Sequence, residues 1–104
     1  RMRRAAKTDA NQTAIVKALR QIGCTVQSLA AVGEGVPDLL VGAYGQTLLM
    51  EIKDGSKPPS RRQLTEDQLV WHGAWTGGPV AIVTDIDGAI RAARAMAAPV
   101  EFAI

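Results

Sequence analysis

Two acidic residues, Asp38 and Glu51, lie on two apolar stretches that a turn at Tyr44 and Gly45 joins. If the turn is centred on these two residues, antiparallel pairing places Asp38 directly opposite Glu51. Carboxylates that face each other across two strands have Cβ atoms about 5 Å apart and repel, unless something positive lies between them. A divalent cation is the natural candidate, so the hairpin predicts a metal site.

Oxygen ligands suit Mg²⁺, which proteins hold with one or two carboxylates while the ion keeps several waters. The backbone carbonyl of Ile52, next to Glu51, is a candidate third ligand. Because side chains alternate along a strand, Lys53 points to the same side as Glu51. Its ammonium would stand beside the attacking water, where a cation favours the hydroxide form. Two carboxylates, a backbone carbonyl and an ammonium group in one place predict a site for phosphodiester hydrolysis.

The Pro-Asp pair at Pro37 and Asp38, followed by Glu51, Ile52 and Lys53, resembles the PD-(D/E)XK nuclease signature. The surrounding string GVPDLLV resembles the VRR-Nuc branch of that superfamily, which is found in phage proteins and repair nucleases. The resemblance extends over most of the chain from residue 9 to residue 94. It implies a restriction-endonuclease-like core, dependence on Mg²⁺ or Mn²⁺, and cleavage of branched DNA such as Holliday junctions or flaps.

One departure from the family concerns the first helix, where many members carry a glutamate that helps to bind the metal. This chain has Asp9, Asn11 and Gln12 in that region. An amide side chain could still bind a metal-bound water, but the lower anionic charge predicts weaker metal affinity. Asn11 and Gln12 are therefore secondary candidates for the site. Glu34, in a glycine-flanked turn shortly before the Pro-Asp pair, is another.

Basic residues gather in two places although the net charge is only +2. One cluster follows the acids and contains Lys57, Arg61 and Arg62 beyond Lys53. Such clusters neutralise backbone phosphates, so we expect these three residues to bind DNA. The other cluster lies in a basic tail over about residues 1–8, which we interpret as a solvated tail rather than as a phosphate contact.

Other polar and aromatic residues lie between positions 65 and 75. Gln68 could approach the scissile phosphate or an attacking water, or it could complete a capping box with Thr65, and the two roles are weighed equally. His72, one helical turn later, is interpreted as a surface or core residue rather than a base or ligand. Trp71 and Trp75 are interpreted as core residues at helical spacing rather than as base-stacking side chains.

The pattern of apolar residues predicts an α/β domain with the element order helix, strand, strand, strand, helix, strand, helix. Thr8 or Asp9 would cap the first helix and Gly23 would end it. The predicted strands cover residues 25–30, 36–42, 47–53 and 80–84. The helices between and after them begin near 65 and 85, with Asp85 or Asp87 as the last cap. With the resemblance, this order implies an αβββαβ core with a mixed four-stranded sheet flanked by helices, plus a C-terminal helix.

Length and composition predict one domain over residues 1–104. The lone Cys24 excludes an internal disulfide and argues against a zinc–thiolate site. No apolar run reaches the length that a membrane span needs, which predicts an intracellular protein with no membrane partner. With the resemblance, this implies a cytoplasmic protein, either bacterial or phage-encoded. Symmetric cleavage of a four-way junction needs two sites, which predicts a homodimer.

Three functions remain open at this stage. The first is a Mg²⁺-dependent DNA endonuclease in which Asp38 and Glu51 hold the ion and Lys53 orients or activates water. The second is a DNA-binding module of the same fold with a weak or decayed site. The third is a non-enzymatic phage structural domain whose acids are merely exposed. Added Mg²⁺ distinguishes the third from the first, because a ligand that binds only the native state must raise its stability.

Overall fold

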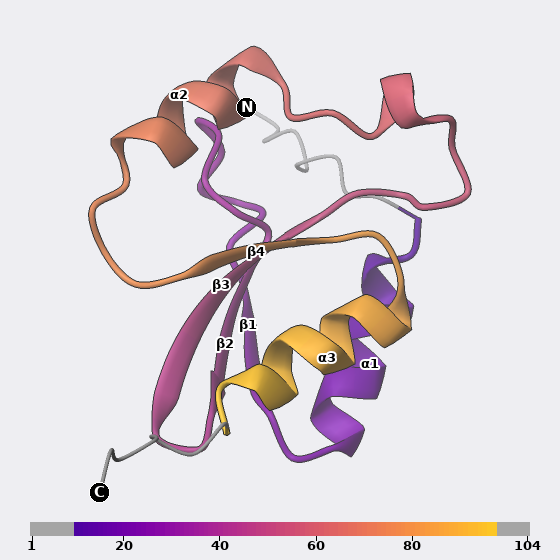
Figure 1. The fold of residues 1–104 in the computed structure, drawn as a ribbon, viewed down its shortest axis with the longest axis vertical. Coiled ribbons are helices and arrows are strands. Elements are labelled where there is room, and N and C mark those ends of the chain that lie inside the picture. Colours follow the sequence, from indigo (N-terminus) through magenta and orange to yellow (C-terminus); the bar gives the residue numbers. More distant parts are fainter. Residues whose placement is uncertain (1–9, 98–104) are drawn as a thin grey trace, which may run out of the picture.

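The computed structural model describes residues 10–97 of the chain. Its elements follow the predicted order: α1 (Gln12–Gln21), β1 (Thr25–Ser28), β2 (Leu39–Ala43), β3 (Gln46–Ile52), α2 (Glu66–Ala74), β4 (Val80–Val83) and α3 (Ile86–Ala95), with a 3-10 turn, η1 (Pro59–Arg61), before α2. The four strands form one sheet in the order β1-β2-β3-β4 (Figure 1). β1, β2 and β3 pair antiparallel, and β4 joins β3 in parallel. This part of the chain is a small α/β domain with a mixed four-stranded sheet and three α-helices.

The hairpin between β2 and β3 has the predicted register. Its turn residues, Tyr44 and Gly45, both have positive φ angles, 56° and 72°, as the tight hairpin turn that matches strand twist requires. The pairs Ala43–Gln46, Gly42–Thr47 and Leu40–Leu49 are confirmed, and the last pair of the ladder is Leu39–Met50. β2 therefore begins three residues later than predicted, so that Asp38 lies immediately before the strand.

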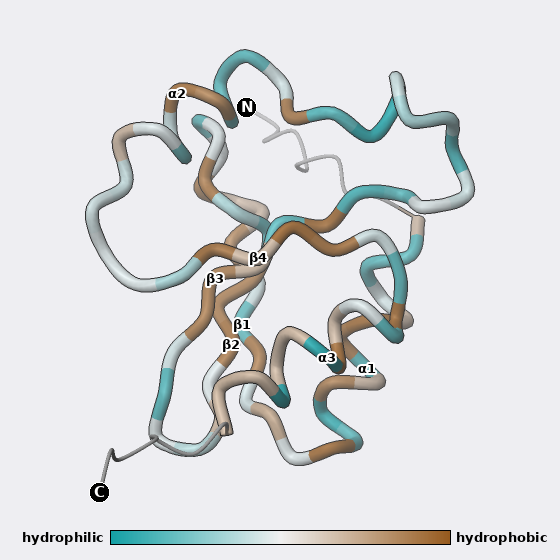
Figure 2. The backbone as a smooth tube through the Cα atoms, viewed as in Figure 1, coloured by the Kyte–Doolittle hydropathy of each residue, from teal (hydrophilic) through white to brown (hydrophobic). Residues whose placement is uncertain are grey.

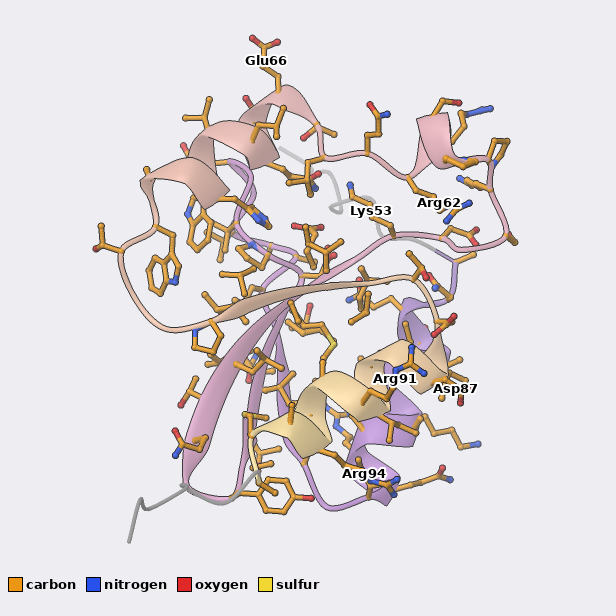
Figure 3. All side chains as sticks on the ribbon, viewed as in Figure 1. Lys53, Arg62, Glu66, Asp87, Arg91 and Arg94 are labelled. Atoms are coloured by element: carbon orange, nitrogen blue, oxygen red, sulfur yellow. The ribbon has the colours of Figure 1, made fainter. Side chains whose placement is uncertain are left out.

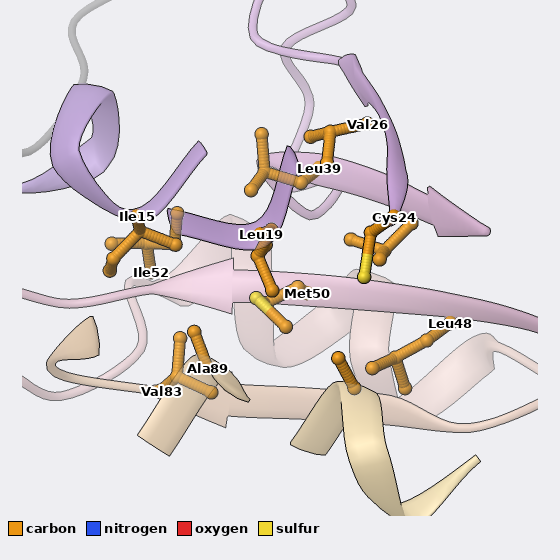
Figure 4. Close-up of a cluster of buried hydrophobic side chains, with 12 residues drawn as sticks. Ile15, Leu19, Cys24, Val26, Leu39, Leu48, Met50, Ile52, Val83 and Ala89 are labelled. Atoms are coloured by element: carbon orange, nitrogen blue, oxygen red, sulfur yellow. The ribbon is translucent and has the colours of Figure 1, made fainter. Parts of the chain in front are cut away.

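The core lies between one face of the sheet and the pair of helices α1 and α3, which pack side by side (Figure 1). Alternate residues of β2 and β3 point into it, and they meet apolar residues from both helices (Figure 4). Most of these side chains are fully buried: Ile15, Leu19, Leu39, Val41, Met50, Ala89 and Ala93. β3 lies between β2, which pairs with it antiparallel, and β4, which pairs with it in parallel, so it is a central strand; Figure 2 shows it as hydrophobic beyond its first residues. Burial of Leu48, Leu49 and Met50 confirms the prediction that this strand is covered on both faces.

The opposite face of the sheet, here called the open face, carries the residues that alternate with the core. Glu51 and Lys53 point to it because Ile52 between them is in the core. α2 lies over the upper end of this face (Figure 1). Two apolar side chains of this face are exposed on the neighbouring strands: Leu40 of β2 is 37% accessible, and Ile82 of β4, the register partner of Glu51, is 52% accessible. The open face is therefore covered along β3, where Leu49, Glu51 and Lys53 are buried, and less so on the neighbouring strands.

The helix caps agree with prediction for the second and third helices. Thr65 forms a complete capping box with Gln68, and the Asp85 carboxylate accepts the Gly88 N–H at the start of α3. α1 begins at Gln12, with Asn11 in the cap position; Thr8 and Asp9, the predicted caps, and the basic tail lie outside the described residues. No helix among residues 10–97 is both long enough and apolar enough to cross a bilayer.

The prediction that Trp71 and Trp75 belong to the core is wrong. Trp71 is half-buried, Trp75 is 42% exposed, and neither lies in the core cluster. The reason is that α2 packs on the open face, away from α1 and α3. The two indoles instead stack on each other, with centroids 5.0 Å apart and planes 16° apart. Trp75 also donates to the Gly78 carbonyl, and its ring lies against Gly77, where a Cβ would come within 2.3 Å of it.

Candidate active site

Asp38 lies where the β2–β3 ladder stops, and its carboxylate accepts a backbone N–H that a carbonyl of the neighbouring strand would otherwise accept. One oxygen, Oδ2, accepts the Ile52 N–H at 2.7 Å. Extending the register by two residues beyond Leu39–Met50 would place Pro37 opposite Ile52. A proline has no N–H to give to the Ile52 carbonyl, so the ladder cannot continue in the usual way. The Pro-Asp pair thus ends the strand pairing and brings a carboxylate to the backbone between Glu51 and Lys53.

Glu51 is a buried acid on the central strand, with only 1% of its surface accessible. Its Oε2 accepts the Gln68 amide Nε2–H at 3.2 Å, and its Oε1 lies 3.3 Å from His72 Nε2. Because a carboxylate only accepts, this contact requires the His72 tautomer that carries the proton on Nε2. Burial, and then the charge of Lys53, lower the pKa of His72 below its ordinary value of 6.5. His72 is therefore a neutral donor to Glu51 near neutral pH.

His72 is a residue whose role the sequence interpretation missed. We expected a surface or core histidine, whereas the structure places it against Glu51 with 14% of its side chain accessible. The available signal was its spacing: residues four apart lie on the same side of a helix, so His72 had to follow Gln68 toward the same place. Its ring also packs against Trp71 in a T-shaped contact, with centroids 5.8 Å and planes 76° apart, so the imidazole has a neighbour on a second side.

Gln68 connects Lys53 to Glu51. Its Oε1 accepts from Lys53 Nζ at 2.7 Å while its Nε2 donates to Glu51. Lys53, labelled in Figure 3, is 9% exposed, and its bond to Gln68 places the ammonium in the same network as the Glu51 carboxylate. The two roles weighed for Gln68 also prove compatible, because the same Oε1 accepts the Thr65 N–H at 2.9 Å and completes the capping box. The cap therefore holds the bridging amide in place.

The N-terminus of α2, which presents Gln68, is packed against the turn before Asp38. Gly33, Glu34 and Gly35 all have positive φ angles, 71°, 59° and 82°. At Gly35 a Cβ would lie 2.2 Å from the Asp67 carbonyl oxygen, so only glycine permits this approach. Glu34 itself is exposed. As a turn residue in the left-handed region it shapes the loop, and its part in a metal site stays a prediction.

Asn11 and Gln12, the two first-helix candidates, differ in what they contact. The Asn11 amide Nδ2 donates to the carbonyls of Lys53, at 3.3 Å, and Thr84, at 3.0 Å. Its Oδ1 is buried and has no hydrogen-bond partner among residues 10–97. Gln12 is 8% exposed, and its Oε1 is likewise buried without a partner in that part of the chain. Both residues thus lie at the start of α1, and Asn11 contacts the backbone of Lys53.

The basic residues after the site lie on the long connection between β3 and α2, which Figure 2 shows as largely hydrophilic. Lys57 and Arg61 are exposed, as a phosphate contact requires. Arg62 is half-buried: its Nε donates to the Lys57 carbonyl at 2.6 Å. It also lines an open pocket together with Asp54 and Asp85. The local contacts thus give Arg62 a part in shaping the loop, beside its predicted part in DNA binding.

The donors at the strand ends suit a hard cation in chemical type. They are two carboxylates, Asp38 and Glu51, and the carbonyl of Ile52, to which the facing proline cannot donate. Within residues 10–97 no group of three or more histidine, cysteine or acidic side chains could hold a metal ion. A site here would accordingly use two acids, the carbonyl oxygen and water, which is a composition that Mg²⁺ accepts.

Comparison with known proteins adds no assignment: no family model, curated protein or solved structure matches the chain.

Proposed function

We propose that the protein is a metal-dependent DNA endonuclease with a restriction-endonuclease-like fold of the VRR-Nuc type. The observation that carries the proposal is one buried network at the end of β3. It contains the Glu51 carboxylate, the Lys53 ammonium and the Gln68 amide between them, and the Asp38 carboxylate bonds the amide of Ile52. Burying charged groups costs several kcal/mol that apolar side chains would avoid. Such clusters are characteristic of sites where charge is needed for chemistry.

Asp38, Glu51 and the Ile52 carbonyl would hold Mg²⁺, with Mn²⁺ as a substitute. When bound, the ion would polarise the phosphate and lower the pKa of a coordinated water. In the reaction, a water oxygen attacks phosphorus, one P–O ester bond breaks, and the departing oxygen takes up a proton. Lys53 would stabilise the negative charge that develops on the phosphate oxygens and orient the attacking water.

Gln68 and the basic loop would support this chemistry without bond changes of their own. Gln68 keeps the Lys53 ammonium next to Glu51, and its position depends on the capping box of α2. Lys57 and Arg61 would bind the DNA backbone, with Arg62 shaping their loop. We propose branched DNA as substrate. A homodimer would supply the second site that symmetric cleavage of a four-way junction needs.

The test compares the wild type with Lys53→Met, in which an unbranched side chain of similar length replaces the ammonium. Lys17→Met, on the exposed surface of α1, is the matched control. Each protein is incubated with labelled four-way junction, flap, duplex and single-stranded DNA in Mg²⁺, Mn²⁺ or EDTA.

The proposal predicts cutting by the wild type and the control, in either metal, and none in EDTA or by Lys53→Met. Cutting that persists in EDTA or in Lys53→Met would contradict it. A wild type that binds the same DNA but never cuts it would favour the alternative of a DNA-binding module with a decayed site.

A further inference from the structure

Asn11 ties together the ends of two neighbouring strands. Lys53 and Thr84 directly follow β3 and β4, whose last pair is Ile52–Val83. The Asn11 amide donates to both of their carbonyls. These contacts bridge 42 and 73 positions of the sequence, so they join three segments that the chain itself holds far apart. The side chain thus acts as a clamp just where the regular ladder ends.

The orientation of this amide follows from its partners. Both carbonyl oxygens are acceptors, so only the nitrogen side of the amide can face them. Asn11 occupies the cap position of α1, where an asparagine side chain usually accepts a backbone N–H of the first turn. Here it makes no such capping hydrogen bond. Oδ1 is buried and has no partner within the described residues. The two hydrogen bonds of the amide nitrogen are therefore the contacts that the Asn11 side chain makes in this part of the chain.

With the Asn11 contact, the backbone N–H, the backbone carbonyl and the side chain of Lys53 each make a hydrogen bond. Its N–H donates to the Val83 carbonyl at 2.9 Å, its carbonyl accepts from Asn11, and its Nζ donates to Gln68. The next strand-to-strand contact, from Gly55 N–H to the Thr84 carbonyl at 3.0 Å, uses the same oxygen that Asn11 binds. Loss of the clamp would therefore loosen the backbone of Lys53 at the point where the chain leaves the sheet.

We propose that Asn11 is a positioning residue that fixes the Lys53 ammonium for the cleavage reaction, and that it does so through the backbone and without contacting metal or DNA. The inference rests on the proposed function of Lys53. It differs from the family expectation for this helix, in which the residue helps to bind the metal. The two roles predict opposite effects of one substitution, Asn11→Asp.

The experiment compares Asn11→Asp and Asn11→Leu, which have similar size and cannot donate, with Ala93→Gly. Ala93 is buried in α3, and the glycine lowers stability without touching the strand ends. Cleavage is measured under multiple-turnover conditions to separate kcat from KM. Thermal unfolding with and without Mg²⁺ and NMR of the Gln68 side-chain amide are recorded for every variant.

The proposal predicts that kcat falls about 10- to 100-fold in both Asn11 variants, the range typical for residues that support a reactive group. KM should stay within about threefold, because ground-state binding is not altered. The Gln68 amide resonances should shift in both Asn11 variants and stay in place in Ala93→Gly, which should keep its kcat.

Three results would overturn the inference. In the first, Asn11→Asp keeps its kcat and gains a larger Mg²⁺-induced rise in melting temperature, as a metal ligand would. In the second, Ala93→Gly loses as much kcat as the Asn11 variants do. In the third, the Gln68 amide resonances of the Asn11 variants match those of the wild type. If the wild type cuts no DNA, the proposed function fails, and the NMR comparison still decides whether Asn11 positions Lys53.

Discussion

Replacing Gln68 by methionine removes three hydrogen bonds while it keeps the length of the side chain. The Lys53 ammonium loses an acceptor at 2.7 Å, Glu51 loses a donor at 3.2 Å, and Thr65 loses its capping partner at 2.9 Å. Hydrogen bonds to charged groups contribute about 1.5–3 kcal/mol each, and a helix cap contributes about 1 kcal/mol. Since neighbouring contacts are not additive, we expect a loss of about 3–5 kcal/mol.

Thermal and urea unfolding measure this loss. At about 4 °C or more per kcal/mol for a domain of this size, the melting temperature of Gln68→Met should fall by at least about 12 °C. Gln63→Met is the matched control, because Gln63 is exposed and a surface substitution changes stability by only about 0.5 kcal/mol. If the free energies of unfolding of Gln68→Met and Gln63→Met lie within about 1 kcal/mol of each other, the hydrogen bonds of the Gln68 side chain do not stabilise the fold.

A second variant, Gln68→Glu, tests whether Glu51 needs a hydrogen-bond donor at position 68. Its carboxylate can still accept from Lys53 and Thr65 but has no donor for Glu51. Two adjacent carboxylates raise the pKa of one of them above the unfolded value of about 4.3. The folded state then binds a proton more tightly than the unfolded chain, so the variant should gain stability relative to wild type as the pH falls and lose it as the pH rises. The opposite trend would contradict this arrangement.

Three further predictions concern residues around the site. The lowered pKa of His72 means that the unfolded chain binds its proton more tightly, so wild-type stability should fall as the pH drops below 6.5, and His72→Leu should show less of this loss in urea unfolding. Gly35→Ala should cost about 2–4 kcal/mol, because a methyl group there meets the α2 backbone, whereas Gly33→Ala, which faces open space at a similar φ, should cost only about 1 kcal/mol; equal losses would refute the packing argument. Arg61→Ala should lower the salt dependence of DNA binding by about one unit of slope while Arg94→Ala, on α3, leaves it unchanged, and fluorescence anisotropy at several salt concentrations distinguishes the two.

The hairpin and the helix caps could be predicted because short-range chemistry determines them. The Tyr44–Gly45 turn and the alternation of apolar residues leave one register that keeps Leu39 and Met50 in the core. Thr65 and Gln68 have the spacing of a capping box, and Asp85 precedes its helix directly. The side on which Glu51 and Lys53 point followed from the same alternation.

The contacts that complete the site could not be predicted in the same way. Asn11 meets Lys53 and Thr84 only because α1 packs across the ends of two strands, and nothing near it in the sequence specifies that. The spacing of Trp71 and Trp75 is the same for a buried stripe and for two rings stacked on an open face. The position of α2, which decides between these, depends on tertiary packing such as the close approach of Gly35.

Calorimetric titration with Mn²⁺ tests most directly whether Asp38 and Glu51 form a cation site. The proteins are the wild type, Glu51→Gln and Glu66→Gln, the last a control on the exposed surface of α2 (Figure 3). We predict one saturable binding event in the wild type and in Glu66→Gln, and its loss in Glu51→Gln. Absence of binding in the wild type at millimolar Mn²⁺, or equal binding in all three proteins, would contradict the account.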